Sequence, residues 1–458
     1  MRAVTNDSQG GWVNAARLTA RWLDQRERVD ALFEALPAQL SAVERARCQH
    51  LVFGVIRHYG RIQTALDTLI AHRPRFSTQA VLCVAGFELL ETAEHEDREG
   101  QVAKIVHHAV EQTKHLSSPA EARLVNAVVR KLAPLLAQPA PPKLALPEVL
   151  ADYFSHPVWL VKRWLQQFGA DATRRLLEWN QTPARLLVRW RDSSAAVPEF
   201  LQPTAWPEFY EAAPGHWGEL ETLLKAQKIF VQDPATRHAI EALKPQAGEE
   251  VLDLCAAPGG KSVAMADAMN ARGGSGRIVA LDLPGPRIAR LQRNLAEVRG
   301  VDVALVQADL LQNAGPVLRE HELPTSYPAV LLDAPCSNTG VMRHRIDVKW
   351  RLQENDFRKH ARQQVSLLHA AARFTAPGGR LVYSTCSIDT DENEAVVKSF
   401  LASKAGGNFT LESSVQCYPW DAGHDGAGVF LLRRSADQGT SKKTDNVRSV
   451  SSVPRKKV

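Results

Sequence analysis

"VLDLCAAPGGKS", residues 251–262, joins a short apolar run to a turn of small residues and the start of a helix. The apolar run predicts a buried strand, and alanine and glycine let the backbone of the turn approach a ligand closely. A helix that begins directly after such a turn points the positive end of its dipole at that ligand. The stretch therefore predicts the first strand and the ligand loop of an α/β domain.

Four more apolar runs follow at intervals, and helical stretches separate them. They read "RIVALD" (277–282), "VALVQAD" (303–309), "AVLLDAPCS" (329–337) and "GGRLVYSTCS" (378–387). Strands that alternate with helices predict a mainly parallel sheet, and such sheets bind ligands at the carboxyl ends of their strands. We expect a Rossmann-like catalytic domain over residues 226–434.

The rest of the chain has a different pattern of apolar residues. Apolar residues of "AARLTARWLDQRERVDALFEAL" (15–36) recur at three- and four-residue steps, which predicts helices, and we expect an all-α domain over residues 1–138. Five prolines between 133 and 149 indicate a linker, set at 139–149. A small α+β domain is expected at 150–225, and the basic tail 435–458 is expected to be disordered.

The net charge is +6, but it is not spread over the chain. Residues 435–458 hold six Lys/Arg against two Asp/Glu and so supply +4 of it. Any RNA-binding surface must therefore come from local clustering of basic residues. Arg45, Arg47, Arg57 and Arg61 form one such cluster in the helical region, where either a solvated helix face or an RNA-contacting face would explain them.

Six cysteines in 458 residues include no CxxC pair. A disulfide framework and a structural zinc site are therefore not expected, and we predict a reduced, cytoplasmic protein without a metal. No stretch approaches the ~18 uncharged apolar residues of a membrane span, and the N-terminus lacks the apolar core of a signal peptide. We expect no membrane partner.

The 251–262 turn lacks the sequence motifs of two common ligand classes, and this narrows the choice of its ligand. A P-loop would need a glycine where Cys255 stands, and a dinucleotide site would need GxGxxG, whereas only Gly259 and Gly260 are present. Asp282, Asp309 and Asp333 end successive strands. Singly, each is typical of a strand-end turn, but together they favour S-adenosylmethionine over NAD or ATP.

Two thiols, Cys336 and Cys386, also follow strand ends. A lone buried cysteine usually packs as a small hydrophobe. Two in the same setting suggest chemistry, but these residues alone do not rank one thiol above the other.

The motifs "DLCAAPGGK", "LLDAPCSNTG", "DVKW" and "YSTCS", in this order, resemble those of the NOL1/NOP2/Sun family of RNA cytosine-5 methyltransferases. The resemblance is strongest to a bacterial branch that acts on 16S ribosomal RNA and carries a NusB-like N-terminal domain, and it covers nearly the whole chain. It implies an S-adenosylmethionine-dependent RNA (cytosine-5) methyltransferase, with RNA as partner, and we expect a monomer. "DGAGVFLLRR" near residue 430 matches the family's closing strand only loosely.

The resemblance also assigns roles. Cys386 would be the nucleophile that adds to cytosine C6, and Cys336 would assist release of the product. DNA cytosine methyltransferases use a Pro-Cys cysteine as nucleophile, which would be Cys336 here. The cofactor site implied by the family consists of Cys255, Ala256, Ala257, Pro258, Gly259, Gly260, Lys261, Asp282, Asp309 and Asp333.

Two other functions compete with this one. The same chemistry on transfer RNA remains open, because only the analogy of the helical N-terminal domain favours ribosomal RNA. An RNA-binding assembly factor with a vestigial methyltransferase fold would tolerate loss of a cysteine or of a ligand aspartate. All of these residues are present, which favours an active enzyme.

Overall fold

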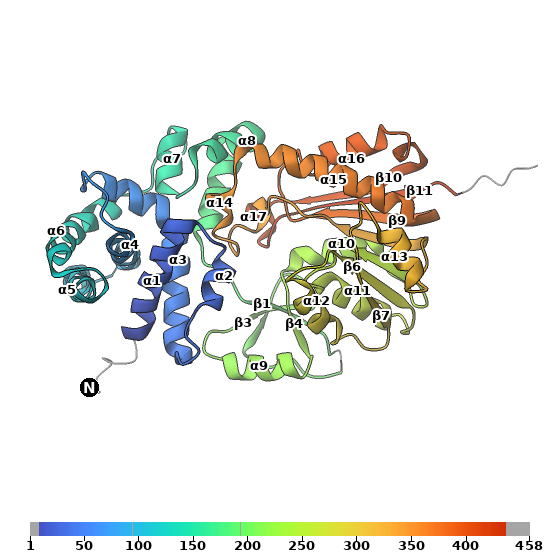
Figure 1. The fold of residues 1–458 in the computed structure, drawn as a ribbon, viewed down its shortest axis with the longest axis horizontal. Helices are drawn as coiled ribbons and strands as arrows, with labels where there is room; N and C mark the ends of the chain where they lie inside the picture. The colour runs from blue at the N-terminus through green and yellow to red at the C-terminus, as the bar shows by residue number, and fades with distance from the viewer. Residues whose placement is uncertain (1–8, 94, 193, 437–458) are drawn as a thin grey trace, which may run out of the picture.

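The computed structural model describes residues 9–93, 95–192 and 194–436. Figure 1 shows a helical part, a larger part built on a twisted sheet, and a second, smaller sheet below them. No helix within the described ranges is long and apolar enough to cross a membrane. The basic tail expected to be disordered lies outside the described residues from 437 onward.

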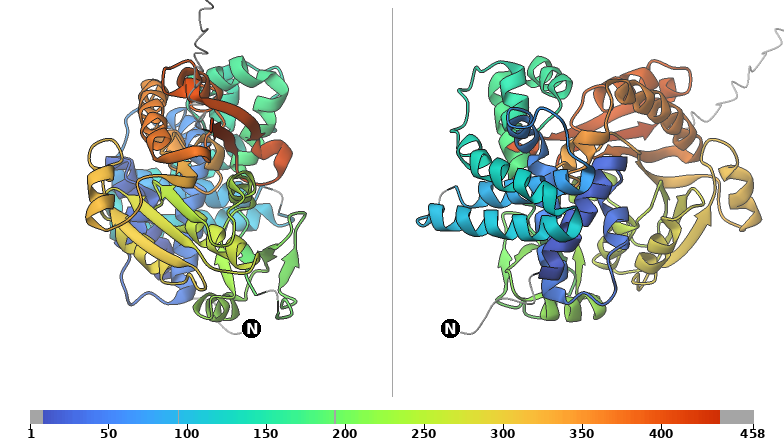
Figure 2. Two further views of the ribbon diagram at one scale, coloured as in Figure 1. Left: turned by 90° about the vertical axis from the view of Figure 1, so that its right-hand side faces the viewer. Right: turned by 60° about the vertical axis from the view of Figure 1, so that its left-hand side comes forward.

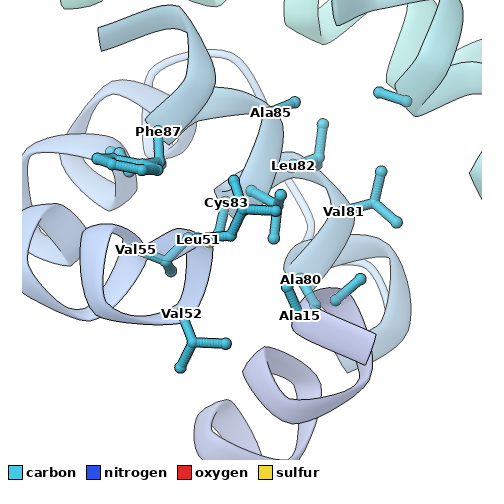
Figure 3. Packing of buried hydrophobic residues seen from close by; sticks show 14 of the residues in the cluster. Ala15, Leu51, Val52, Val55, Ala80, Val81, Leu82, Cys83, Ala85 and Phe87 are labelled. Atoms are coloured by element: carbon cyan, nitrogen blue, oxygen red, sulfur yellow. The ribbon is translucent and has the colours of Figure 1, made fainter. Parts of the chain in front are cut away.

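Six helices form the N-terminal part, which confirms the expected all-α fold. They are α1 (Gln9–Gln25), α2 (Val29–Glu34), α3 (Ala42–Asp67), α4 (Phe76–Glu91), α5 (Arg98–Leu116) and α6 (Pro119–Leu136). A capping box of Ser41 and Glu44 starts α3. Helix α4 is the centre of the bundle, and its Leu82, Cys83 and Phe87 pack against α3 in the core shown in Figure 3.

The arginine cluster of this domain is used largely inside the protein. Arg57 is only 6% exposed, and Arg61 lies over the ring of Tyr153. Further partners are Leu136 O and Gln138 O for Arg61, Glu88 for Arg47, and Pro37 O for Arg45. Arg57 is thus buried, whereas Arg45, Arg47 and Arg61 are partly exposed, so an RNA-contacting face at these three residues stays a prediction.

Helices α7 (Pro147–Tyr153) and α8 (Val158–Gln181) come next and pack against residues of the C-terminal domain, including Met342, Phe357 and Ile388. A four-stranded antiparallel sheet then follows in the order β2-β3-β1-β4. Its elements are β1 (Leu187–Trp190), β2 (Leu201–Pro203), β3 (Phe209–Ala212), α9 (Trp217–Lys225) and β4 (Ile229–Val231).

Two of these bounds differ from the expected domain limits. Helix α7 begins at Pro147, inside the segment 139–149 expected as linker, because proline is well tolerated at the first position of a helix. Strand β4 lies beyond the expected end at 225, yet it hydrogen-bonds along β1. We therefore propose that the small domain extends to about residue 231.

The catalytic sheet has seven strands in the order β10-β11-β9-β8-β5-β6-β7, and β5 to β9 are mutually parallel. The strands are β5 (Glu250–Leu254), β6 (Arg277–Asp282), β7 (Asp302–Gln307), β8 (Tyr327–Asp333), β9 (Thr375–Thr385), β10 (Phe409–Cys417) and β11 (Ala427–Arg434). Strand order reverses between β5 and β8, and open α/β sheets bind ligands at such a switch point.

Helices cover both faces of this sheet, which confirms the Rossmann-like class. One face carries α10 (Arg237–Leu243), α11 (Gly260–Asn270) and α12 (Ile288–Leu295). The other carries α13 (Ala314–Glu320), α15 (Glu354–Phe374) and α16 (Glu394–Leu401). Short helices lie in the connections: η1 (Pro234–Thr236), η2 (Thr339–Val341), α14 (Val348–Arg351), η3 (Gly406–Asn408) and α17 (Pro419–Ala422). Figure 2 shows the layers from two further sides.

Helix α14 joins the catalytic part to the helical domain. Lys349 Nζ donates to Arg57 O at 2.9 Å, and Trp350 Nε1 donates to Ile56 O at 2.8 Å, both on α3. Gly60 permits the approach, because a Cβ there would lie 3.1 Å from the Trp350 ring and 2.9 Å from a backbone atom of Ser155. The "DVKW" motif thus forms a contact between domains.

This contact predicts a pH dependence of stability. Burial, with Arg57 nearby, lowers the pKa of Lys349 well below its usual value. In the unfolded chain the pKa of Lys349 is about 10.4. At a pH between the folded and unfolded pKa values, the unfolded chain binds more protons than the folded chain. Lys349 therefore makes the free energy of unfolding rise with pH, by at most about 1.4 kcal/mol per pH unit. Urea unfolding from pH 7 to 10 should show a smaller rise for Lys349→Met. The exposed control Lys359→Met should keep the wild-type slope, and equal slopes for all three proteins would contradict the prediction.

Candidate active site

The two thiols singled out in the sequence meet at the carboxyl edge of β8 and β9. These strands are parallel neighbours in a register that pairs Asp333 with Ser384, so the segments that follow them leave the sheet side by side. Cys336 Sγ lies 3.2 Å from Cys386 Sγ. Cys336 is 7% exposed, whereas Cys386 is only partly buried. The geometry leaves Cys386 the more accessible thiol.

Asn338 holds the pair from one side. Its backbone is left-handed, with φ of 60°, a conformation that asparagine tolerates better than most residues. Its Nδ2 donates to Cys336 O at 2.8 Å, and its Oδ1 lies 3.3 Å from Cys386 Sγ. Sequence reasoning missed this residue, although an asparagine directly after the Cys-Ser pair was a signal for such a turn.

The two thiols differ in acidity. A hydrogen bond from Cys336 lowers the pKa of the Cys386 thiol; burial and Asp333 oppose this shift, and Lys261 and Arg345 support it. The same hydrogen bond and burial raise the pKa of Cys336 well above its ordinary value. The contact therefore makes Cys386 the more acidic thiol of the pair, and the thiolate is the reactive form of cysteine.

A buried carboxylate ties the two thiol segments together. Glu392, which is fully buried, accepts from Ser337 N at 2.9 Å and from Ser387 Oγ at 2.6 Å. Ser337 Oγ also donates to it, and Gln364 Nε2 does so at 3.0 Å. Ser337 follows one cysteine and Ser387 follows the other, so Glu392 fixes their separation. Nothing local in the sequence identified it.

The 255–261 turn lies at the carboxyl end of β5. Cys255 and Gly259 adopt positive φ angles of 60° and 100°. Asp282, at the end of β6, accepts from Ala257 N and Leu283 N at 2.8 Å each. Arg287, more than half exposed, also donates to that carboxylate. Asp282 therefore shapes the turn.

Lys261 and Asp333 form an ion pair across the switch point, with Nζ 2.7 Å from Oδ2. Beneath them Asp253 is fully buried, and burial raises its pKa to about 7. Ser262 donates to Asp253 Oδ2 at 2.5 Å, whereas Oδ1 is buried without a hydrogen-bond partner among the described residues. Asp253 was not among the predicted site residues.

A cavity of about 360 Å³ opens beside this pair, between the turn and β4. Four acidic side chains line it, namely Asp233, Asp253, Glu297 and Asp333, against the two basic side chains Lys261 and Arg290. A phosphate-rich ligand would prefer the opposite balance, so the cavity favours a ligand that carries positive charge. Ala256, Pro258 and Gly260 also line it, whereas Cys255, Asp282 and Asp309 do not.

Asp309 stands two residues beyond β7 at the same edge of the sheet. Its carboxylate accepts from Leu311 N at 2.8 Å and from Gln312 Nε2 at 2.7 Å. It is partly exposed. The structure thus places it near the turn without bringing it into the cavity.

A third group of titratable residues adjoins the site. His344 Nε2 lies 3.5 Å from Asp425 Oδ1 and 3.9 Å from Asp233 Oδ2. Burial raises the pKa of Asp425 well above its ordinary value, and Asp233 and Cys386 reinforce the shift. These residues come from segments far apart in the chain, which is why sequence reasoning did not group them.

Comparisons with known proteins place this geometry in a family. Residues 240–417 match the family profile "16S rRNA methyltransferase RsmB/F", and residues 13–134 match the NusB family. The ribosomal RNA small subunit methyltransferase B of Sodalis glossinidius is 32% identical over 410 residues, covering 85% of this chain and 88% of that protein. The probable counterpart of Bacillus subtilis is 29% identical, with coverage of 79% and 81%.

Solved structures agree on the fold. The crystal structure of PH0851 superposes with a TM-score of 0.71 and 23% identity, covering 93% of this chain and 99% of that one. NSun6 from Pyrococcus horikoshii gives a TM-score of 0.51 and 18% identity over 61% of this chain and 99% of that one. On the strength of the sequence matches, the chain belongs to the RsmB/F family of 16S rRNA methyltransferases.

Proposed function

We propose that this protein methylates C5 of a cytosine in 16S ribosomal RNA, with S-adenosylmethionine as donor and a transient bond between Cys386 and C6 of the base. The observation that carries the proposal is the thiol pair, 3.2 Å apart, beside the ion pair of Lys261 and Asp333. Two thiols of opposite acidity suit a reaction that needs a nucleophile and a proton donor at one carbon atom.

The residues present fit S-adenosylmethionine. Four carboxylates and two basic side chains line the cavity beside the turn, and this excess of acidic groups suits the ammonium and sulfonium charges of this molecule. The unpartnered Asp253 Oδ1 is one acceptor available there. Asp282 would accept from the ribose hydroxyls, and Asp309 is close enough along the sheet edge to serve the adenine. When bound, the cofactor supplies an electrophilic methyl group.

The thiols perform the remaining chemistry. Cytosine C5 is a poor nucleophile until C6 becomes tetrahedral. The Cys386 thiolate adds to C6, a C–S bond forms, and the electron pair of the C5–C6 bond becomes available at C5. After methylation a base, which solvent water can supply, takes the C5 proton; the C–H electron pair restores the C5–C6 double bond, and the C–S bond breaks with its electron pair returning to the Cys386 sulfur. Splitting one difficult substitution into addition and elimination is the general advantage of covalent catalysis.

Cys336 would assist the second half of this cycle. Its pKa is raised, so it remains protonated and can return its hydrogen bond to the Cys386 sulfur as the C–S bond breaks. A thiol stabilised as an anion leaves more readily. This assignment gives the two cysteines different steps.

The substrate is tested by bisulfite sequencing of total RNA from a deletion strain. One cytosine of 16S ribosomal RNA should lose its protection, and wild-type protein, but not Cys386→Ser, should restore it. Loss of protection in a transfer RNA instead would contradict the proposed substrate while leaving the chemistry intact.

Replacing Cys386 and replacing Cys336 should affect different steps of the reaction. Cys386→Ser exchanges a thiolate for a hydroxyl that stays protonated at neutral pH, so neither methylated RNA nor a covalent complex should form. Cys336→Ser should still attack and transfer the methyl group, but the adduct should resolve slowly. Protein bound covalently to RNA should then appear as a retarded band on a denaturing gel.

The reverse pattern would exchange the roles. If the complex accumulates with Cys386→Ser and not with Cys336→Ser, the enzyme attacks with the Pro-Cys thiol, as DNA cytosine methyltransferases do. If neither variant traps RNA and both lose activity, the covalent mechanism is wrong.

Asp282→Asn should weaken binding of the cofactor. Loss of charge-assisted hydrogen bonds to a ribose costs about 1.5–3 kcal/mol, which corresponds to roughly a ten- to hundredfold higher Kd. Isothermal titration with S-adenosylhomocysteine measures this change. Asp302→Asn is the matched control, because Asp302 lies at the opposite end of the neighbouring strand and its side chain is 78% exposed. Equal affinity for both variants would refute the assignment.

Glu392→Gln should lower kcat while leaving cofactor affinity unchanged. The amide turns one acceptor into a donor that faces Ser337 N and Gln364, so the thiol segments lose their common anchor. We expect a stability loss of about 1–3 kcal/mol, measured by urea unfolding. The exposed Glu394→Gln, two residues on, should change neither quantity. An unchanged kcat in a destabilised Glu392→Gln protein would limit Glu392 to a structural role.

A further inference from the structure

Three side chains with metal-binding atoms converge outside the active site. His238 comes from α10, Cys417 ends β10, and His424 lies in the segment between α17 and β11. One ligand atom of each lies within 4.8 Å of the ligand atoms of the other two. Cys417 is 9% exposed and His424 is 4% exposed. The cluster is therefore buried and draws on three separate elements.

One imidazole of the cluster has a hydrogen-bond partner on Nδ1. His424 Nδ1 lies 2.7 Å from Asp425 O, whereas the nearest carboxylate to His238 Nδ1, Glu241 Oε2, is 3.7 Å away. The Asp425 carbonyl keeps the proton of His424 on Nδ1 and leaves the lone pair on its Nε2. This is how metal-ligating histidines are usually oriented in proteins.

The atoms left over have no other use in the described structure. His238 Nε2 is buried and has no hydrogen-bond partner among the residues described. Unpartnered buried polar atoms carry a free-energy cost, and a bound cation would remove it. Arg237 lies near Cys417 and favours its thiolate, although burial raises the pKa of this thiol.

We propose that His238, Cys417 and His424 bind one divalent transition-metal ion, with zinc the best match to one sulfur and two nitrogen donors. Zinc takes such ligands at about 2.3 Å from sulfur and about 2.0–2.1 Å from nitrogen, so its tetrahedral donors lie roughly 3.5 Å apart. The three ligand atoms lie within 4.8 Å of one another, so a small closure of the cluster brings them to that spacing. Water would complete the tetrahedron.

The metal site would stabilise the backbone segments that pack next to Cys386. Two residues beyond His424, Gly426 N donates to Gly340 O at 2.8 Å, and Gly340 N donates to Cys386 O at 3.0 Å. A Cβ on Gly426 would lie 2.9 Å from the Gly340 backbone, so these segments touch. A metal that joins α10 to this segment would restrict its movement relative to Cys386.

This inference replaces the expectation of a metal-free protein, which rested on the absence of CxxC. The three donor residues are distant in sequence, so no local spacing of residues indicates a metal site. The loose match of "DGAGVFLLRR" to the family's closing strand falls directly after His424, in the segment that contributes to this cluster.

The test uses the full-length chain with Cys336→Ala and Cys386→Ala, so that the active-site thiols cannot bind the probe. Titration with Co²⁺ should saturate at one equivalent, give a sulfur-to-cobalt charge-transfer band with the strong visible absorption of a tetrahedral site, and reverse with one equivalent of Zn²⁺. Adding Cys417→Ser should abolish the charge-transfer band. Cys48→Ser, a buried thiol of the helical domain, should retain it.

A second variant distinguishes the loss of a metal ligand from a folding defect. His424→Gln keeps every remaining thiol and should weaken Co²⁺ binding at least tenfold, and zinc should raise the melting temperature of the background protein but not of this variant. Absence of stoichiometric binding in the background protein would overturn the proposal. So would a charge-transfer band that survives Cys417→Ser. Binding without such a band would place the ion at the oxygen-rich group of Asp233, His344 and Asp425 instead.

Discussion

The parallel pairing of β8 with β9 is the constraint on which the site depends. Neighbouring strands lie about 4.8 Å apart, so two residues that leave a shared edge at matching heights must meet. Asp333 opposite Ser384 sets those heights, and the thiols three and two residues later come within 3.2 Å. A shift of one residue in register would turn alternate side chains to the other face and separate the pair. Glu392 then holds the loops at the separation that the sheet has set.

The close approach of the thiols has an electrostatic consequence. The hydrogen bond between the two sulfurs divides them by acidity, because it lowers the pKa of Cys386 and raises the pKa of Cys336. The division follows their surroundings: Cys336 is the more buried, whereas Cys386 faces Lys261 and Arg345. The same Lys261 pairs with Asp333 beside the cavity. Lys261 thus lines the cavity and also lowers the pKa of the Cys386 thiol, which links the two parts of the site electrostatically.

The elements were predictable from sequence to the extent that they are local. Strand-end aspartates, the 251–262 turn and the helical stripes of the N-terminal domain all follow from periodicity and turn chemistry. Asn338, Glu392 and Asp253 were not predictable, because their roles depend on which strands are neighbours. The proposed place of strand β4 in the small domain could not be predicted for the same reason, because it rests on the pairing of β4 with β1. The arginines of α3 looked like a surface cluster, since charge alone does not indicate that Arg57 is buried.

The "DVKW" motif shows how a family signature can serve assembly and not chemistry. Lys349 and Trp350 donate to backbone carbonyls of α3 and contact no thiol. Only η2 and the short segment before α14 separate them from Asn338, which orients Cys336. The helical domain is therefore attached to the chain thirteen residues after Cys336 and thirty-seven residues before Cys386. These two hydrogen bonds restrict the position of the helical domain relative to the segment that carries Cys336.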